Sequence, residues 1–190
     1  MRLAQCLRFH CRPRLQLDKE LIADSSRLAF VQRAQGIPAL AVRKKSGESG
    51  RRFATLIPLL MHAGEPSILL TLRSSSLRKH RGEVSFPGGE LEAGETVEAA
   101  ALRETAEEIG LQPEDVSLWT RLKPLSARNL RDTAVPVVGR VRDGLAVSSL
   151  QRNPEEVAEI LVAPLSVLLH PANVWHTQFR HNQLQLKLQV

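Results

Sequence analysis

The sequence contains no tyrosine, and only 5 phenylalanine and 2 tryptophan residues occur among its 190 positions. Proteins that bind nucleic-acid bases by stacking need exposed aromatic rings, so this scarcity argues against a base-stacking module. Cysteine is equally rare, because only Cys6 and Cys11 are present and both lie close to the N-terminus. The body of the chain can therefore form neither a disulfide framework nor a zinc site with paired cysteines.

Long apolar runs are also missing. The longest mainly apolar stretch, residues 53–61, is less than half of the roughly 20 residues that a membrane-spanning helix requires. We therefore predict no transmembrane segment. The composition, 43% hydrophobic and 24% charged, is typical of one globular domain with an appendage, and it excludes disordered, collagen-like and coiled-coil proteins.

A strong basic excess is absent from most of the chain, although the formal net charge is +6. Residues 1–52 contain 12 Lys and Arg against 4 Asp and Glu, whereas the remaining residues contain 14 against 16. The positive charge thus belongs to the N-terminal part, and the body is slightly acidic. We accordingly predict no nucleic-acid partner.

The first 17 residues contain four arginines and no acidic residue, since the first acidic side chain is that of Asp18. Such an Arg-rich, acid-poor segment with interspersed leucines is typical of mitochondrial presequences. We expect residues 1–17 to direct the protein to mitochondria; the alternative is a disordered basic tail on a cytoplasmic protein. Residues 18–52 are predicted to contain a helix, within 18–36, and a basic linker with Gly and Ser.

From residue 53 onward, short apolar segments alternate with turn residues, which is typical of β-strands. A long helix among these strands predicts a mixed α+β domain over residues 53–190. A helical turn is expected at 164–169 and a final strand at 184–190. The other expected strands are 53–60, 67–72, 83–86, 116–125, 134–141 and, with interspersed acidic residues, 155–162.

Val97–Ile109 is expected to be a helix, because Thr96 can cap its N-terminus, Gly110 can end it, and neither Pro nor Gly interrupts it. Helical periodicity divides this segment into two faces. The apolar face is expected to consist of Ala99, Leu102, Ala106 and Ile109, and the acidic face of Glu104, Glu107 and Glu108.

Three carboxylates at this spacing repel one another, and Arg103, which can reach Glu107 at i+4, cannot neutralise all of them. A divalent cation would satisfy the cluster, and ligation by oxygen alone favours Mg²⁺ or Mn²⁺ over zinc. The alternative is an ordinary solvated acidic stripe. The preceding turn, with Gly88 and Gly89, favours the functional interpretation, because such a loop lets backbone N–H groups approach an anionic ligand.

The spacing of these residues resembles the signature of the Nudix hydrolases over residues 89–111. It consists of Gly89, five residues, Glu95, seven residues, Arg103 and Glu104, two residues, Glu107 and Glu108, one residue, and Gly110 with Leu111. All seven invariant positions, from Gly89 to Gly110, match, and Leu111 ends the signature. One departure is Thr105, where the pattern prefers an aliphatic residue.

This resemblance implies the Nudix fold, a mixed β-sheet flanked by helices in an α/β/α sandwich. It also implies metal-dependent hydrolysis of a diphosphate, with Mg²⁺ or Mn²⁺ held by Glu104, Glu108 and Glu107. Arg103 would orient the carboxylates. The general base stays open among Glu107, Glu95, Glu155 and Glu156, because a base must lie within hydrogen-bond reach of the attacking water.

Segments outside the signature resemble the coenzyme A diphosphatase subgroup of this family. They are residues 69–74 and 77–89 upstream, and 153–160 and 176–180 downstream. The likeness implies hydrolysis of coenzyme A or acyl-coenzyme A to 3′,5′-ADP and a 4′-phosphopantetheine product. It places Arg73, Gly88 and Gly89 at the substrate, with Arg73 on a phosphate.

The sequence leaves two alternatives to coenzyme A hydrolysis open. One is hydrolysis of another nucleotide diphosphate, such as NADH or a nucleoside triphosphate, since substrate preference in the family lies outside the signature. The other is a catalytically silent Nudix-like domain that binds a ligand. The subgroup also continues with a C-terminal helix, and the sequence has no residues for it after the expected final strand. We therefore expect a Nudix fold without that helix.

Overall fold

The computed structural model describes residues 22–36, 50–126, 132–173, 176–181 and 184–189. The predicted presequence and residues 37–49 of the predicted linker lie outside these ranges, so the presequence and the division at residue 52 stay predictions. In the described part of the chain, no helix is long and apolar enough to cross a membrane.

The core is a mixed eight-stranded β-sheet. Its central path runs in the order β3-β2-β1-β7-β5, with β4 paired to β1, β6 paired to β7 and β8 paired to β2. β1 and β7 are parallel, and the other pairs are antiparallel. The strands are β1 (Arg52–His62), β2 (Glu65–Arg73), β3 (Val84–Ser85), β4 (Gly88–Glu90), β5 (Val116–Arg121), β6 (Leu125–Ser126), β7 (Thr133–Val141) and β8 (Val157–Pro164).

β1 and β2 separate along their length, and this separation makes room for the site. They pair only from Leu59↔Ile68 to His62↔Glu65, next to the turn that joins them. Farther from that turn, β4 pairs with the start of β1, and β3 pairs with the end of β2. The segment from β3 to β4 therefore runs between the two diverging strands, and it carries Gly88 and Gly89.

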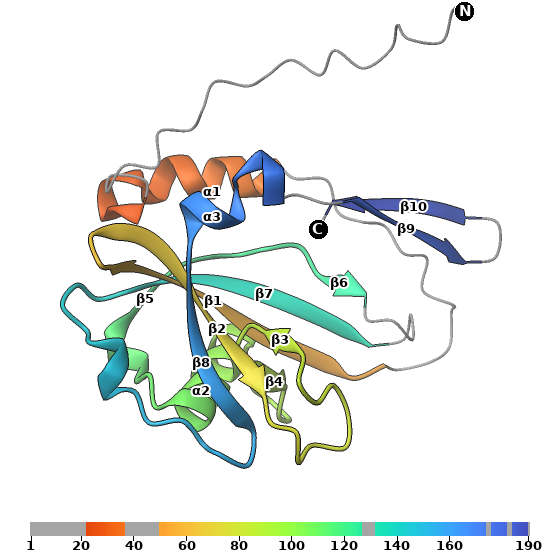
Figure 1. Cartoon of the computed structure of the whole chain (residues 1–190), viewed down its shortest axis with the longest axis horizontal. Coiled ribbons are helices and arrows are strands. Elements are labelled where there is room, and N and C mark those ends of the chain that lie inside the picture. The colour runs from red at the N-terminus through yellow and green to blue at the C-terminus, as the bar shows by residue number, and fades with distance from the viewer. Residues whose placement is uncertain (1–21, 37–49, 127–131, 174–175, 182–183, 190) are drawn as a thin grey trace, which may run out of the picture.

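Helices cover both faces of the sheet, which confirms the expected α/β/α sandwich (Figure 1). On one face, α2 (Val97–Ile109) packs Ala100, Ala101 and Ile109 against Leu56 and Val137 of the sheet. On the other face, Phe30 of α1 (Arg27–Gln35) and Leu165 of α3 (Leu165–Leu168) join the cluster of Ile22, Leu59, Ile68, Trp119 and Val138. Each cluster buries apolar side chains, which is the main stabilising contribution to such a layered fold.

Most predicted elements are confirmed, with shifted ends. The strand expected at 116–125 is two strands, β5 and β6, separated by a segment that contains Pro124, whose nitrogen cannot donate a ladder hydrogen bond. The helix expected within 18–36 is α1, preceded by a 3₁₀ turn at Asp24–Ser26. The final strand is β10 (Leu184–Gln189), which pairs antiparallel with β9 (His176–His181) in a separate two-stranded sheet.

The ends of α2 agree with the prediction, but its buried face agrees only in part: Ile109 is buried as expected, and Leu102 packs against the core. Thr96 Oγ1 accepts a hydrogen bond from the Ala99 N–H at 3.1 Å, and Gly110 ends the helix at φ 72°. The buried residues are Val97, Ala100, Ala101, Thr105, Glu108 and Ile109, whereas Ala99 is exposed and Leu102 and Ala106 are half-buried. The helix is thus turned relative to the predicted face, because Glu108, expected on the solvated side, lies against β4.

Candidate active site

The site is formed by three parts of the fold: α2, the glycine-containing β4, and the end of β2. α2 contributes Arg103, Glu104, Glu107 and Glu108, and β2 ends with Arg73. Glu95 lies in the loop between β4 and α2. The structure therefore brings together residues that are up to 35 positions apart in the sequence.

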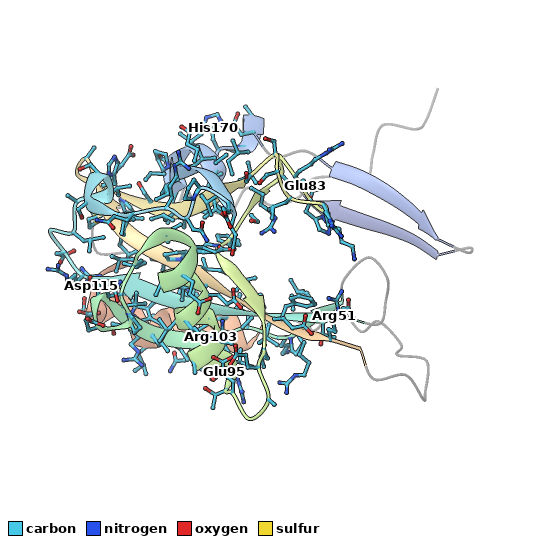
Figure 2. All side chains as sticks on the ribbon, turned by 90° about the horizontal axis from the view of Figure 1, so that it is seen from below. Arg51, Glu83, Glu95, Arg103, Asp115 and His170 are labelled. Carbon is cyan, nitrogen blue, oxygen red and sulfur yellow. The ribbon has the colours of Figure 1, made fainter. Side chains whose placement is uncertain are left out.

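Arg103 connects α2 to the loop that precedes it. Its Nε and Nη2 donate to the two carboxylate oxygens of Glu95 at 2.9 and 3.0 Å, and Nη2 also donates to the Glu90 carbonyl at 3.1 Å. Figure 2 shows Arg103 and Glu95 side by side. Nη1 donates to Glu104 at 2.9 Å and reaches Glu107 only at 3.4 Å. The predicted i+4 pair exists, but the bidentate pair with Glu95 is the tighter contact.

Hydrogen bonds fix the Glu95 carboxylate beside Arg103. Its Oε2 also accepts a hydrogen bond from the Glu92 N–H at 3.1 Å. The hydrogen bonds from Arg103, followed by that from Glu92, lower the pKa of the Glu95 carboxyl below its usual value. A carboxylate with both oxygens engaged in this way fits a positioning role better than that of a proton acceptor.

Glu104 lies directly over the backbone of Gly89. A Cβ atom at position 89 would collide with the Glu104 carboxylate group, so glycine is needed there for the carboxylate to approach the strand. Burial is the largest influence on the Glu104 carboxyl and raises its pKa, while the hydrogen bond and charge of Arg103 act in the opposite direction.

Glu108 is the most deeply buried carboxyl group of the site, with 3% of its side chain exposed. Its Oε2 accepts a hydrogen bond from the Gly88 N–H at 3.2 Å, and its Oε1 lies 3.7 Å from Arg73 Nη1. Burial raises the pKa of Glu108 to about 7, although the Gly88 hydrogen bond and the Arg73 charge lower it. This carboxyl group is thus placed where its charged form is poorly solvated.

Arg73 lies at the end of β2, next to an irregularity in its pairing with β8. Its side chain is 26% exposed, and its Nε is buried with no hydrogen-bond partner among the described residues. A buried donor without a partner costs about 1–3 kcal/mol, so an incoming acceptor would be favoured there. Phosphate oxygens accept hydrogen bonds from guanidinium groups in a bidentate geometry, which suits the predicted contact of Arg73 with a substrate phosphate.

Glu107 and Glu155, two further predicted candidates, face solvent. The Glu107 side chain is 59% exposed and pairs with Arg103, and Glu155 is exposed in the turn before β8. Glu156, next to it, is half-buried, and its charge raises the pKa of both Glu104 and Glu108. Of these three carboxylates, only Glu156 is half-buried.

Two features of the site could not be read from the signature. The Gly88 N–H and the Glu90 carbonyl act through the backbone, so their residue types carry no signal for the contacts they make. Glu156 is 48 positions beyond Glu108, and only the pairing of β8 with β2 brings it near. The signal in the sequence was the pair of acidic residues at the start of the predicted strand 155–162, which made Glu156 a candidate general base.

The donor set fits a hard divalent cation. The carboxylate oxygens of Glu104, Glu108 and Glu156 repel one another, and all-oxygen ligation is what Mg²⁺ and Mn²⁺ prefer. Across the described ranges, no three acidic, His or Cys side chains are already arranged at metal-binding spacing. In this structure one Glu104 oxygen accepts a hydrogen bond from Arg103, and one Glu108 oxygen accepts from the Gly88 N–H.

Substitution of the two glycines should have different effects on stability. A Cβ at position 88, where φ is 151°, meets the backbone of Ala54 and Thr55, whereas a Cβ at 89 meets only the end of the Glu104 side chain. Gly88→Ala should lower the free energy of unfolding by about 1–3 kcal/mol, and Gly89→Ala by less than about 1, as measured by urea unfolding. Equal losses would show that Glu104 cannot move aside.

The burial of Glu108 should make the metal-free protein less stable as the pH rises. Its pKa is about 7 in the folded chain against 4.5 as the ordinary value, so folding favours the protonated carboxyl. The stability contribution therefore falls between about pH 4.5 and pH 7 and is constant above that range, by an amount on the order of 3 kcal/mol.

Glu108→Gln removes this titration and serves as the reference. The unfolding free energies of the wild type and the variant, measured in urea with a chelator from pH 4 to 8, should diverge as the pH rises, with the wild type becoming the less stable. A difference that stays constant over this range would contradict the burial of a titrating carboxyl group.

Residues 50–183 match the model of the NUDIX domain. The chain is 37% identical over 161 residues to Nudix hydrolase 3 of Caenorhabditis elegans, a match that covers 84% of this chain and 66% of that protein. It is 43% identical over 128 residues to the human mitochondrial coenzyme A diphosphatase NUDT8, covering 66% of this chain and 53% of the relative. The chain thus spans about half to two thirds of the length of these relatives.

Solved structures show the same fold. A Nudix hydrolase from M. smegmatis, RenU, is similar with a TM-score of 0.53 and 25% identity, over 68% of this chain and 84% of that one. The Ap4A hydrolase of C. elegans, in a binary complex, has a TM-score of 0.51 and 20% identity, over 60% of this chain and 80% of that one. These similarities show the fold, and the match of residues 50–183 to the NUDIX domain shows that the chain belongs to the Nudix family.

Proposed function

We propose that the protein is a metal-dependent hydrolase that cleaves the diphosphate of coenzyme A and its acyl derivatives. The observation that carries this proposal is the buried Glu108 carboxyl group, flanked by Glu104 on α2 and by Arg73 on β2. This arrangement combines oxygen ligands for a cation with a guanidinium for a phosphate. The names of the relatives support the substrate, since the human and mouse proteins are called coenzyme A diphosphatases.

Glu104 and Glu108 are the residues that would hold Mg²⁺ or Mn²⁺. Such an ion, when bound, neutralises charge on a diphosphate and lowers the pKa of a bound water. Glu107, the third ligand that the resemblance implies, is exposed and pairs with Arg103, so its ligand role stays a prediction. Arg103, in the middle of α2, pairs with Glu95 of the preceding loop and also donates to the Glu104 carboxylate, so it limits where that carboxylate can lie.

In the proposed reaction, the oxygen of a water molecule forms a bond to one phosphorus of the diphosphate. The bond from that phosphorus to the bridging oxygen breaks, and the water gives up a proton. The products are 3′,5′-ADP and 4′-phosphopantetheine, or its acyl derivative. Arg73 would bind a phosphate oxygen of the substrate through Nε and Nη, and the backbone at Gly88 and Gly89 leaves space for the close approach of the anion.

We also propose that the protein acts in mitochondria. The support is the composition of residues 1–17 and the printed names of relatives, which include the mitochondrial protein NUDT8 and the mitochondrial Nudix hydrolase 15 of Arabidopsis thaliana. Imaging of the chain with a fluorescent tag at its C-terminus should show mitochondrial signal that is lost when residues 1–17 are deleted. A distribution that the deletion leaves unchanged would refute the presequence.

The function is tested by incubating the purified full chain with coenzyme A and Mg²⁺ or Mn²⁺, followed by mass spectrometry. We expect 3′,5′-ADP from the wild type and a loss of at least about 100-fold in the rate for Glu108→Gln, because a buried ligand to the cation is removed. The same assay is repeated with NADH and with nucleoside triphosphates, which together with coenzyme A form a substrate panel.

Each outcome of this panel has a definite meaning. Faster turnover of NADH or of a nucleoside triphosphate would overturn the choice of coenzyme A within the same mechanism. No product from any diphosphate, by a protein with a cooperative urea transition, would overturn hydrolysis and favour a domain that only binds its ligand. Normal product formation by Glu108→Gln would exclude the proposed role of that carboxylate.

A further inference from the structure

The start of β1 carries an aromatic side chain on the face of the sheet opposite α2. Ala54 packs in the cluster against α2, and side chains alternate between the two faces of a strand, so Phe53 points to the other face. α1 and α3 cover that face around Leu59 and Trp119, and both helices lie away from β3 and β4 (Figure 1). Phe53, which is half-buried, thus lies toward the end of the face that the helices do not cover.

The apolar surface at Phe53 continues across three strands. Phe53 is in register with Ala134 of β7, and Ala134 is in register with Leu125 of β6. Residues in register on neighbouring strands point to the same face, so these three side chains form one apolar row. Leu125 is 48% exposed, and Ala134 is half-buried like Phe53. The apolar row is therefore accessible to a ligand.

Arg51 lies over the Phe53 end of the apolar row. Its guanidinium carbon is 5.3 Å from the centroid of the Phe53 ring. Nη1 donates to Glu90 Oε2 and Nη2 donates to Asp132 Oδ2, each at 3.4 Å. The Arg51 N–H also donates to Oδ1 of Asp132, which is buried, at 2.9 Å. The guanidinium is therefore held in place, although 55% of the Arg51 side chain is exposed.

The apolar row and the candidate active site meet at β4, which begins at Gly88 and ends at Glu90. The Gly88 N–H donates to the buried Glu108 carboxylate. The Glu90 carbonyl accepts from Arg103, and the Glu90 carboxylate pairs with Arg51. Two residues of a strand span roughly 7 Å, so a diphosphate at Gly88 and a group that contacts Arg51 can belong to one nucleotide.

We propose that Arg51, supported by Phe53, binds the adenine base of the substrate by stacking. Bases stack on guanidinium planes as well as on aromatic rings, and one base needs only one such group. The Glu90 carboxylate can accept a hydrogen bond from the adenine amino group. A pantetheine or acyl chain has no π-face, so a guanidinium fixed over a ring favours the nucleotide half of the substrate. This inference rests on the proposed function, because coenzyme A joins adenosine to its diphosphate.

Binding of 3′,5′-ADP to the purified full chain, measured by isothermal titration calorimetry, tests the proposal without hydrolysis. Arg51→Lys keeps the charge and loses the planar group, and Phe53→Leu keeps the apolar bulk and loses the ring. Each variant should bind 3′,5′-ADP at least about fivefold more weakly, because this is the lower end of the effect of stacking one base. Binding of 4′-phosphopantetheine should stay within about twofold of the wild type.

Arg52→Lys is the matched control, since it makes the same change on the next residue, whose exposed side chain points to the other face of β1. Its affinity for 3′,5′-ADP should stay within about twofold of the wild type. An equal loss in Arg51→Lys and Arg52→Lys would overturn the proposal, as would full affinity in Arg51→Lys, which would leave only a contact of charge. Weaker binding of 4′-phosphopantetheine with unchanged binding of 3′,5′-ADP would assign the apolar row to the other half of the substrate.

Urea unfolding of each variant separates a binding effect from a loss of the fold. The ion pairs of Arg51 are largely exposed and contribute little to stability, so Arg51→Lys should keep the urea midpoint of the wild type and carries the test if Phe53→Leu lowers it. Failure of the wild type to bind 3′,5′-ADP would also overturn the adenine site.

The adenine site and the proposed hydrolysis can fail separately. Hydrolysis of coenzyme A with an unchanged KM in Arg51→Lys and Phe53→Leu would overturn the adenine site and leave the proposed function intact. Weaker 3′,5′-ADP binding in both variants, in a protein that cleaves no diphosphate, would support the adenine site and overturn hydrolysis.

Discussion

The contact between the Glu108 carboxylate and the Gly88 N–H is the constraint on which the rest of the site depends. It places an acidic group inside the layer between α2 and the sheet, where 3% of its side chain is exposed. This is only feasible because β1 and β2 diverge and the segment between them carries two glycines at the closest approach. The contact therefore requires three features at once: the separation of the strands, the glycines between them and the orientation of α2.

The negative charges around this contact are not fully balanced by the nearby arginines. Arg103 is used by Glu95 and Glu104, and it also holds the Glu90 carbonyl, so it fastens the loop to α2. Arg73 is then the cation left to face the buried Glu108, and it approaches only to 3.7 Å. Burial raises the pKa of Glu104 and Glu108, and the charges of Arg103 and Arg73 only partly offset this effect. A bound divalent cation would neutralise the excess negative charge of these carboxylates.

Local signals in the sequence predicted the elements well, because caps, glycines and strand periodicity act over a few residues. α2 begins after its N-cap residue Thr96 and ends at Gly110, as predicted. The buried face of α2 was predicted only in part. Ile109 is buried as expected, but Glu108 was placed on the solvated side, whereas it accepts a backbone hydrogen bond from a strand 20 residues earlier. Thr105, the one departure from the signature, is fully buried and satisfies its hydroxyl on the Ala101 carbonyl. The Thr105 bond is local to the helix, whereas the contact of Glu108 with Gly88 is not contained in any local pattern.

The burial of charged groups lowers the stability of the metal-free protein, and it also favours the binding of ligands at the site. A carboxyl group with a pKa near 7, beside other carboxylates, costs free energy in the metal-free protein, as does a buried guanidinium nitrogen without an acceptor. Any cation or phosphate that relieves these costs binds the folded state alone, since the unfolded chain does not bring Arg73, Glu104 and Glu108 together. Binding and folding are therefore coupled, and the strained groups are those that would touch the substrate or its metal.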